Sequence, residues 1–209
     1  MQILKPSAIA IAKASNIIRE RGSVVYPTDT VYGLAVNALD KSCLRQLFKI
    51  KKRPETKPIP VMIKDVAMAK KLAFIDKKME NILEKIWPGP VTAILEKRQI
   101  VPDILTANQN TIGLRIPDYQ LIIDWLKLLD LPITGTSANF SGEEPISKPK
   151  EIIKVFKDHH PCPNLFLDAG DLSPNSPSTV IDLTTSQPKI LRIGPVSKEE
   201  LLRIFANAI

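Results

Sequence analysis

Cysteine and histidine are scarce in this 209-residue chain, and their scarcity excludes several kinds of site. The two cysteines, Cys43 and Cys162, are too few for a disulfide framework, which predicts a reduced, cytoplasmic protein. The two histidines are adjacent, at His159 and His160. One adjacent pair argues against a histidine-based catalytic triad or a multi-histidine metal centre, so we expect no metal site built by the protein.

Glycine, aromatic residues and long apolar runs are also in short supply. With eight glycines and neither a P-loop nor a Rossmann string, the chain would have to bind any nucleotide without those motifs. Aromatic residues make up 5%, which leaves few stacking platforms for single-stranded nucleic acid. Apolar runs fall far short of the roughly 20 residues of a membrane span. Lys5 and Lys13 interrupt the N-terminal apolar stretch, so we expect neither export nor membrane insertion.

The remaining composition is that of an ordinary globular protein, with 44% hydrophobic and 24% charged residues. Helical and strand-like patterns follow one another without a regular βαβ rhythm. This predicts one α/β domain over residues 1–209, with a mixed sheet and flanking helices.

Hydrophobic periodicity and capping residues place the expected elements. In the first helix Ser7 is the expected cap, Ile9, Ile11, Ile17 and Ile18 share one side, and Gly22 ends it. The expected helices are 7–22, 40–50, 65–73, 77–86, 120–129, 150–157 and 197–206, the last capped by Ser197. The expected strands are 24–27, 59–63, 91–95, 111–116, 132–136, 165–167, 180–183 and 190–193. Three long loops, 97–110, 140–149 and 170–177, are expected to rim a cavity.

Positive charge is concentrated in one segment. The formal net charge is +7, and residues 41–57 hold seven basic residues and one acid, which leaves +6 there. Pro54 favours an extended backbone at Arg53, and in an extended stretch Lys51 and Arg53 point to the same side. Together with Lys57 they would suit a polyanion such as a triphosphate. A solvated helix end followed by a basic loop explains the charge equally well.

Three strings place polar or charged groups at the end of a predicted strand or within one. Residues 131–142, LPITGTSANFSG, and residues 26–34, YPTDTVYGL, follow a strand with hydroxyl and amide groups suited to phosphate or a small polar ligand. Ordinary turn chemistry is the alternative for both. In TIGLRIPD, Arg115 lies inside an apolar strand and needs an anionic partner. That partner is either a substrate carboxylate or an internal carboxylate.

Together these strings resemble the YrdC/Sua5 family over residues from about 21 to about 195. The strings, in the family's order, are YPTDTVYGL, K-x-R at 51–53 with P-x-x-K after it, WPGPVT, TIGLRIPD, S-x-N at 137–139 followed by Ser141 and Gly142, STVID and ILRIGP. The resemblance implies a twisted α/β fold around a large, positively charged cavity.

The resemblance also implies an activity. Family members convert L-threonine, bicarbonate and ATP to threonylcarbamoyl-AMP and pyrophosphate, normally with Mg²⁺ carried by ATP. A separate threonylcarbamoyl transferase complex then modifies adenosine 37 of tRNAs that read ANN codons. Two alternatives remain open: an RNA-binding or ribosome-maturation protein that uses the same basic cavity, with weak direct RNA binding, and a paralogue of different activity.

Matching positions carry the implied site residues. The family's catalytic residues correspond to Lys51, Arg53, Ser137 and Asn139. The residues implied on the ATP side are Arg53, Lys57, Thr111, Ser137, Pro145 and Arg192. The residues implied on the threonine side are Thr30, Arg115, Gly135 and Ser178.

The chain departs from the family pattern in two respects. Some members carry a histidine shortly after the K-x-R string, on the threonine side, where this chain has Met62. Long members add a C-terminal domain after a linker, and this chain is expected to be the short form without it. Any lid over the site would then have to come from another segment.

Overall fold

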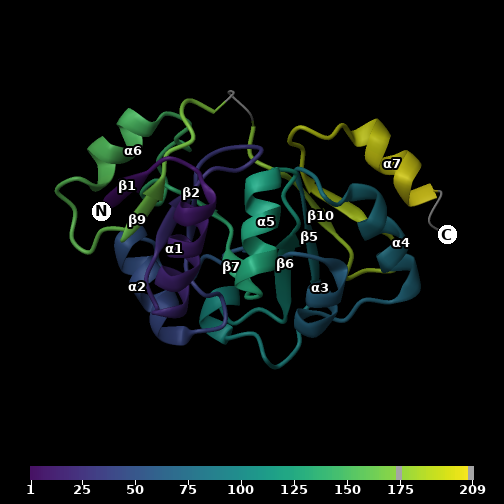
Figure 1. Cartoon of the computed structure of the whole chain (residues 1–209). Coiled ribbons are helices and arrows are strands. Elements are labelled where there is room, and N and C mark those ends of the chain that lie inside the picture. The colour runs from purple at the N-terminus through teal and green to yellow at the C-terminus, as the bar shows by residue number, and fades with distance from the viewer. Residues whose placement is uncertain (173–175, 207–209) are drawn as a thin grey trace.

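A computed structural model describes residues 1–172 and 176–206 and places the strands in two mixed sheets (Figure 1). The first sheet has the order β1-β9-β2-β3-β8 and the second the order β11-β10-β5-β6-β4-β7. The strands are β1 (Gln2–Leu4), β2 (Val24–Tyr26), β3 (Gly33–Ala35), β4 (Val61–Met62), β5 (Val91–Glu96), β6 (Thr111–Arg115), β7 (Ile133–Thr134), β8 (Thr136–Ser137), β9 (Leu165–Leu167), β10 (Thr179–Asp182) and β11 (Lys189–Arg192).

Each sheet combines parallel and antiparallel neighbours. In the first, β2 pairs antiparallel with β3, so that Tyr26 lies opposite Gly33, and parallel with β9. In the second, β6 pairs antiparallel with β5 and parallel with β4, which places Met62 opposite Arg115. The expected mixed α/β architecture is therefore confirmed, with two sheets where the sequence suggested one.

Helices cover both sheets, and polar side chains begin most of them. The helices are α1 (Ala8–Arg19), α2 (Lys41–Lys51), α3 (Val66–Leu72), α4 (Lys77–Ile86), the 3₁₀ turn η1 (Asp103–Thr106), α5 (Gln120–Leu129), α6 (Pro149–Phe156) and α7 (Lys198–Ala206). Asp40, Asp65 and Asp76 each accept a backbone N–H of the helix that follows. Ser7 does the same for α1, and Ser197, as expected, for α7. Among the described residues no helix is long and apolar enough to span a membrane.

The helices α1 and α5 lie side by side over the region where the sheets approach each other (Figure 1). Trp125 of α5 packs edge-on against Tyr26 of β2, with ring centroids 5.6 Å apart. Arg19, at the end of α1, donates to the carbonyl oxygen of Leu128 at 2.9 Å. The shared core holds Met62, from the second sheet, as well as residues of both helices and the first sheet.

The first helix differs from its prediction at its end and on one face. It ends at Arg19, and the left-handed backbone conformation that terminates it falls on Arg21, with φ 65°, not on Gly22. The buried face is formed mainly by small residues and Ile11 and Ile18, whereas Ile9 is 82% exposed. Alanine at positions 10 and 14 lets the helix approach the sheet closely, and this moves the buried face away from Ile9.

A single glycine joins the two sheets next to the site described below. β7 belongs to the second sheet and β8 to the first, and only Gly135 separates them. The Gly135 N–H donates to the carbonyl oxygen of Pro60 at 2.7 Å, and the Thr134 N–H to that of Val36 at 3.1 Å. The predicted strand 132–136 is thus two short strands, because the chain crosses from one sheet to the other within it.

Candidate functional site

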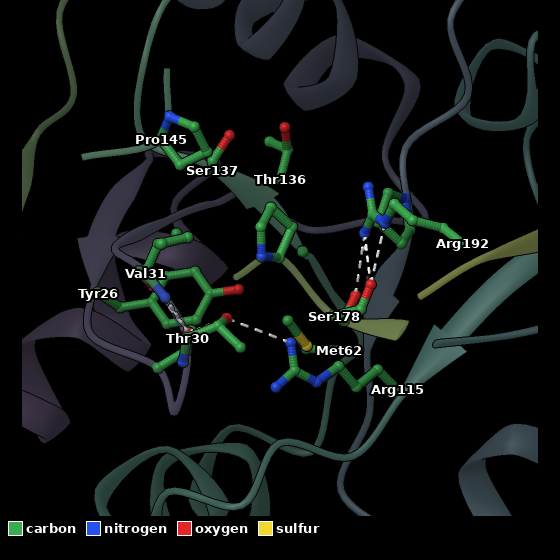
Figure 2. Close-up of a pocket in the computed structure, with 15 residues that line it drawn as sticks. Tyr26, Thr30, Val31, Met62, Arg115, Thr136, Ser137, Pro145, Ser178 and Arg192 are labelled. Atoms are coloured by element: carbon green, nitrogen blue, oxygen red, sulfur yellow. Dashed lines mark hydrogen bonds between the residues drawn. The ribbon is translucent and has the colours of Figure 1, made fainter. Parts of the chain in front are cut away.

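A pocket of about 240 Å³ opens where β2, β3 and β8 of the first sheet face β4, β6 and β11 of the second (Figure 2). It lies below the range of about 300–1,000 Å³ usual for drug-sized ligands and is smaller than the large cavity that the resemblance implies. Its lining residues are Tyr26, Thr28, Thr30, Val31, Gly33, Pro60, Met62, Arg115, Gly135, Thr136, Ser137, Pro145, Pro177, Ser178 and Arg192.

All four residues expected on the threonine side, Thr30, Arg115, Gly135 and Ser178, line this pocket. Arg115 is 3% exposed. Its Nε donates to the carbonyl oxygen of Gly89 at 2.9 Å, and its Nη2 forms a short ion pair with Asp29. Its Nη1 reaches the Thr30 hydroxyl over a long 3.4 Å. The internal carboxylate of Asp29 is therefore the partner present, and Nη1 makes only the long contact with Thr30.

The turn between β2 and β3 is built by a threonine hydroxyl. Thr28 Oγ1 accepts the N–H groups of Thr30 at 3.1 Å and Val31 at 3.2 Å, and it donates to the Val31 carbonyl oxygen at 2.7 Å. The turn interpretation of YPTDT is therefore right for Thr28. The same turn carries Thr30 to the pocket beside Arg115 (Figure 2).

A second arginine of the pocket lining, Arg192, converges with hydroxyl groups. Arg192 Nη2 donates to the Ser178 carbonyl oxygen at 2.7 Å, and the Ser178 hydroxyl lies 2.9 Å from that of Thr92. Partial burial lowers the pKa of Arg192, and the positive charge of Arg115 lowers it further. Two cations close enough to affect each other across a pocket provide a site for an anion.

The S-x-N string supplies the pocket wall, with Ser137 among the lining residues. Asn139 is 4% exposed, and its amide nitrogen donates to the carbonyl oxygens of Phe140 at 3.0 Å and Glu143 at 2.6 Å. Asn139 therefore folds the turn that follows the wall. Pro145, at the end of that turn, lines the pocket, and so does Pro177. Part of the predicted loop 170–177, residues 173–175, lies outside the described residues.

The K-x-R residues are arranged differently from the prediction. Lys51 is the last residue of α2, and Lys52 takes a left-handed conformation with φ 48°. Lys51 is buried, whereas Arg53 is half-buried and lines a separate hollow. The expectation of an extended stretch with both cations on one side is therefore wrong. Arg53 donates to the carbonyl oxygens of Lys57 at 3.3 Å and Pro58 at 2.8 Å.

Several expected site residues are outside the described lining of the pocket: Lys51, Arg53, Lys57, Thr111 and Asn139. Thr111 begins β6, whose other end is Arg115. Thr111 and Arg115 are four steps apart along an extended strand, a distance of about 13 Å. The loop 97–110 contributes no described lining residue either, and η1 within it packs against α2. The catalytic roles of Lys51, Arg53 and Asn139 and the ATP-side roles of Arg53, Lys57 and Thr111 stay predictions.

The floor of the pocket is apolar and tightly fitted. Tyr26 donates to the Thr134 carbonyl oxygen at 3.0 Å, and a Cβ on Gly33 would lie 2.7 Å from the Tyr26 ring. A Cβ on Gly135 would lie 3.0 Å from Cε of Met62. Met62 therefore fills the space beside Arg115 with a thioether (Figure 2), and no titratable group stands at this position.

Sequence reasoning assigned no role to Asp29, Tyr26 or Thr92. Asp29 lies within the YPTDT string and pairs with Arg115. The available signal was an unexplained carboxylate in one string and an arginine in need of a partner in another. Thr92 follows WPGPV and meets Ser178. No feature of the sequence alone shows that Tyr26 lies against the pocket.

The described residues contain no group of three or more His, Cys, Asp or Glu side chains placed to hold a metal ion. Beside the pocket, Asp29 already forms an ion pair with Arg115. The donors around this pocket are hydroxyl groups and arginines, which suit an anion better than a cation.

The two-sheet fold and the arginine-lined pocket define an α/β protein with a pocket suited to a small anionic ligand where the sheets adjoin. A family model for Sua5, YciO and YrdC proteins, described as "Telomere recombination", matches residues 16–194. The chain belongs to this family.

Curated relatives cover most of the chain. A threonylcarbamoyl-AMP synthase from Pyrococcus abyssi is 33% identical over 195 residues, which span 93% of this chain and 56% of the relative. A threonylcarbamoyl-AMP synthase from Bacillus subtilis is 30% identical over 193 residues, which span 91% of this chain and 55% of the relative. The chain thus spans a little over half the length of these two relatives.

Solved structures show the same fold. The crystal structure of P. abyssi Sua5 complexed with L-threonine superposes with a TM-score of 0.89 at 31% identity, over 97% of this chain and 59% of that one. The crystal structure of E. coli YciO gives a TM-score of 0.84 at 28% identity, over 96% of this chain and 98% of that one.

Proposed function

We propose that this protein is a threonylcarbamoyl-AMP synthase that makes threonylcarbamoyl-adenylate and pyrophosphate from L-threonine, bicarbonate and ATP. The observation that carries the proposal is the convergence of Arg115 and Arg192 on one pocket with the Ser137 wall and the hydroxyl groups of Thr30 and Ser178. The names of the relatives and the threonine complex of P. abyssi Sua5 support the same reaction.

The chemistry joins two anions. The threonine amine attacks the carbon of bicarbonate-derived CO₂, which gives an N-carboxylate and releases water and a proton overall. A carboxylate oxygen of that carbamate then attacks the α-phosphorus of ATP, and the bond to pyrophosphate breaks. Cations that neutralise the approaching charges lower the barrier to this step. No protein nucleophile is needed.

The pocket lining offers groups for both substrates. Arg115 Nη1 and Thr30 would hold the threonine carboxylate and orient the amine. Ser137, Pro145 and Arg192 of the same lining are assigned to the phosphates, and Arg53 and Lys57, outside the lining, are assigned to the phosphate approach. The nucleoside would extend beyond a pocket of this volume. Mg²⁺ would enter with ATP, coordinated by phosphate oxygens and water.

The product is an activated carbamoyl donor. A separate threonylcarbamoyl transferase complex would move the group to adenosine 37 of tRNAs that read ANN codons. The enzyme itself would then need to bind only small molecules.

A pyrophosphate-release assay tests the proposal. We expect the purified protein to release pyrophosphate from ATP only when L-threonine and bicarbonate are both present. Serine and glycine in place of threonine serve as controls for the amino-acid side. Release that is independent of threonine or of bicarbonate would reject the synthase function.

A further inference from the structure

Lys51 is a buried cation held by backbone carbonyl groups. Lys51 is only 1% exposed, and its side chain is one of the largest that are fully buried in the described structure. The ammonium donates to the Ser137 carbonyl oxygen in a short hydrogen bond and to that of Asn139 at 2.7 Å. Burying an ammonium group is costly unless hydrogen bonds to the protein replace those it made to water. Both of the hydrogen bonds to Lys51 come from the S-x-N string.

The contact between α2 and the wall is reciprocal. The Ser141 N–H donates to the Lys51 carbonyl oxygen at 2.8 Å, while Asn139 bonds to the Phe140 and Glu143 carbonyl oxygens. Lys51 thus fastens the end of α2 to the turn 137–143 at three points. Ser137 lines the pocket and Lys51 does not, so the lysine stands behind the wall that the serine presents.

We propose that Lys51 is a positioning residue that fixes the Ser137–Asn139 wall from behind and makes no contact with substrate. This inference rests on the proposed function for its catalytic consequence. The two carbonyl oxygens point toward the ammonium, so the negative ends of their dipoles are turned to Lys51. The positive charge behind the wall then adds to the field of Arg115 and Arg192 without occupying the pocket.

The charge on Lys51 changes near neutral pH. Burial and, as the smaller cause, the positive charge of Arg53 together lower its pKa to about 7. Its direct partners, the carbonyl groups of Ser137 and Asn139, carry no charge, and Glu143 and Glu144 farther along the turn are exposed. A polyanion in the pocket favours the protonated lysine, so binding of ATP should be accompanied by proton uptake and should weaken as pH rises above 7.

Hydrogen exchange in the free protein separates positioning from substrate contact. In Lys51→Met we expect backbone amides of residues 137–143 to exchange at least tenfold faster than in the wild type, with no ligand present. Lys49→Met, which removes an exposed charge from the same helix, should leave those amides unchanged. Unchanged exchange in Lys51→Met would overturn the proposal.

Affinity for MgATP as a function of pH tests the electrostatic consequence. Between pH 7 and 9 we expect wild-type affinity to fall about tenfold more than that of Lys51→Met, whose affinity should be low throughout. A purely structural lysine would give parallel curves, and this result would overturn the proposal. If Lys51→Met does not fold, calorimetry of MgATP binding to the wild type in two buffers of different ionisation enthalpy decides: proton uptake supports the proposal and its absence overturns it.

These outcomes are distinguishable from failure of the proposed function. If the wild type releases no threonine-dependent pyrophosphate, the synthase function is rejected. The exchange rates of residues 137–143 in the free protein still decide whether Lys51 holds the wall.

Discussion

At the scale of single residues, the site depends on charges that are buried and paired. Arg115 is almost fully buried and its ion pair with Asp29 lies beside the pocket, with the Asp29 side chain 13% exposed. Removing one partner of such a pair leaves an uncompensated charge in a poorly solvated place. Asp29 therefore holds Arg115 in place before any substrate carboxylate arrives.

Asp29→Asn should lower the free energy of unfolding by about 3 kcal/mol, because Arg115 loses its carboxylate while remaining buried. Urea denaturation followed by circular dichroism measures the loss. Asp118→Asn is the matched control: it makes the same charge change at an exposed position nearby and should cost less than about 0.5 kcal/mol. Equal losses in the two variants would mean that the ion pair contributes nothing beyond ordinary surface charge.

Lys51 should make stability depend on pH in a defined direction. Its folded-state pKa, about 7, is below the ordinary 10.5, so between these values the unfolded chain binds more protons than the folded one. The lysine therefore destabilises the fold most below pH 7, and stability rises with pH above it. The difference in unfolding free energy, wild type minus Lys51→Met, should grow by about 1 kcal/mol per pH unit from pH 7 to 9. A flat or falling difference in urea titrations would contradict the pKa assignment.

At the scale of elements, two glycines let the sheets meet around the pocket. A Cβ on Gly33 would press on the Tyr26 ring at 2.7 Å, and a Cβ on Gly135 would meet the flexible Met62 side chain at 3.0 Å. A packed aromatic ring cannot move as easily as the end of a methionine. The two positions should therefore differ in their tolerance of a methyl group.

Gly33→Ala should cost about 2 kcal/mol in unfolding free energy, and Gly135→Ala less than about 1 kcal/mol, because overpacking is relieved more easily by Met62. Denaturant melts of both variants measure the order. If the contact with Met62 causes the loss, Gly135→Ala should cost less in a Met62→Ala background than in the wild type. A larger loss in Gly135→Ala than in Gly33→Ala would contradict this account of the floor.

Helices were more predictable from the sequence than the short strands that shape the site. Periodicity gives α4 and α5 with their observed bounds. The two-residue strands β7 and β8 carry too few side chains for a period, and their division at Gly135 depends on which sheet each strand joins. Neither β1 nor β3 was predicted, for the same reason. The sequence did not predict that the Lys51 side chain is buried. The helix extends to Lys51, and Lys52 takes a left-handed conformation that only the folded chain reveals.

At the scale of the whole molecule, the +7 net charge does not lie mainly in the pocket. Of the seven basic residues between 41 and 57, Lys51 is buried behind the pocket wall. Four others, Arg45, Lys49, Lys52 and Arg53, line a shallow hollow on the outer side of α2. Helical spacing gathers Arg45, Lys49 and Lys52 on one face. The sequence located the charge correctly, and the solvated-face interpretation describes most of it better than a triphosphate pocket does.

The outer face of α2 allows the enzymatic and RNA-binding functions to be separated. Charges screened beyond about 8 Å at physiological salt act weakly on a ligand elsewhere. Arg45→Glu with Lys49→Glu should therefore leave threonine-dependent pyrophosphate release within about twofold of wild type at 0.15 M salt. The same double variant should lose any weak binding of duplex RNA, because that binding depends on total phosphate neutralisation.

The converse variant completes the test. Arg115→Gln removes a cation that lines the pocket, so it should abolish pyrophosphate release while RNA binding in a gel-shift assay stays unchanged. If Arg115→Gln weakened RNA binding as strongly as the double variant on α2, nucleic acid would have to occupy the pocket itself. Because the pocket holds only about 240 Å³, we expect the two activities to separate, with catalysis at the junction of the sheets and RNA attraction on the outer face of α2.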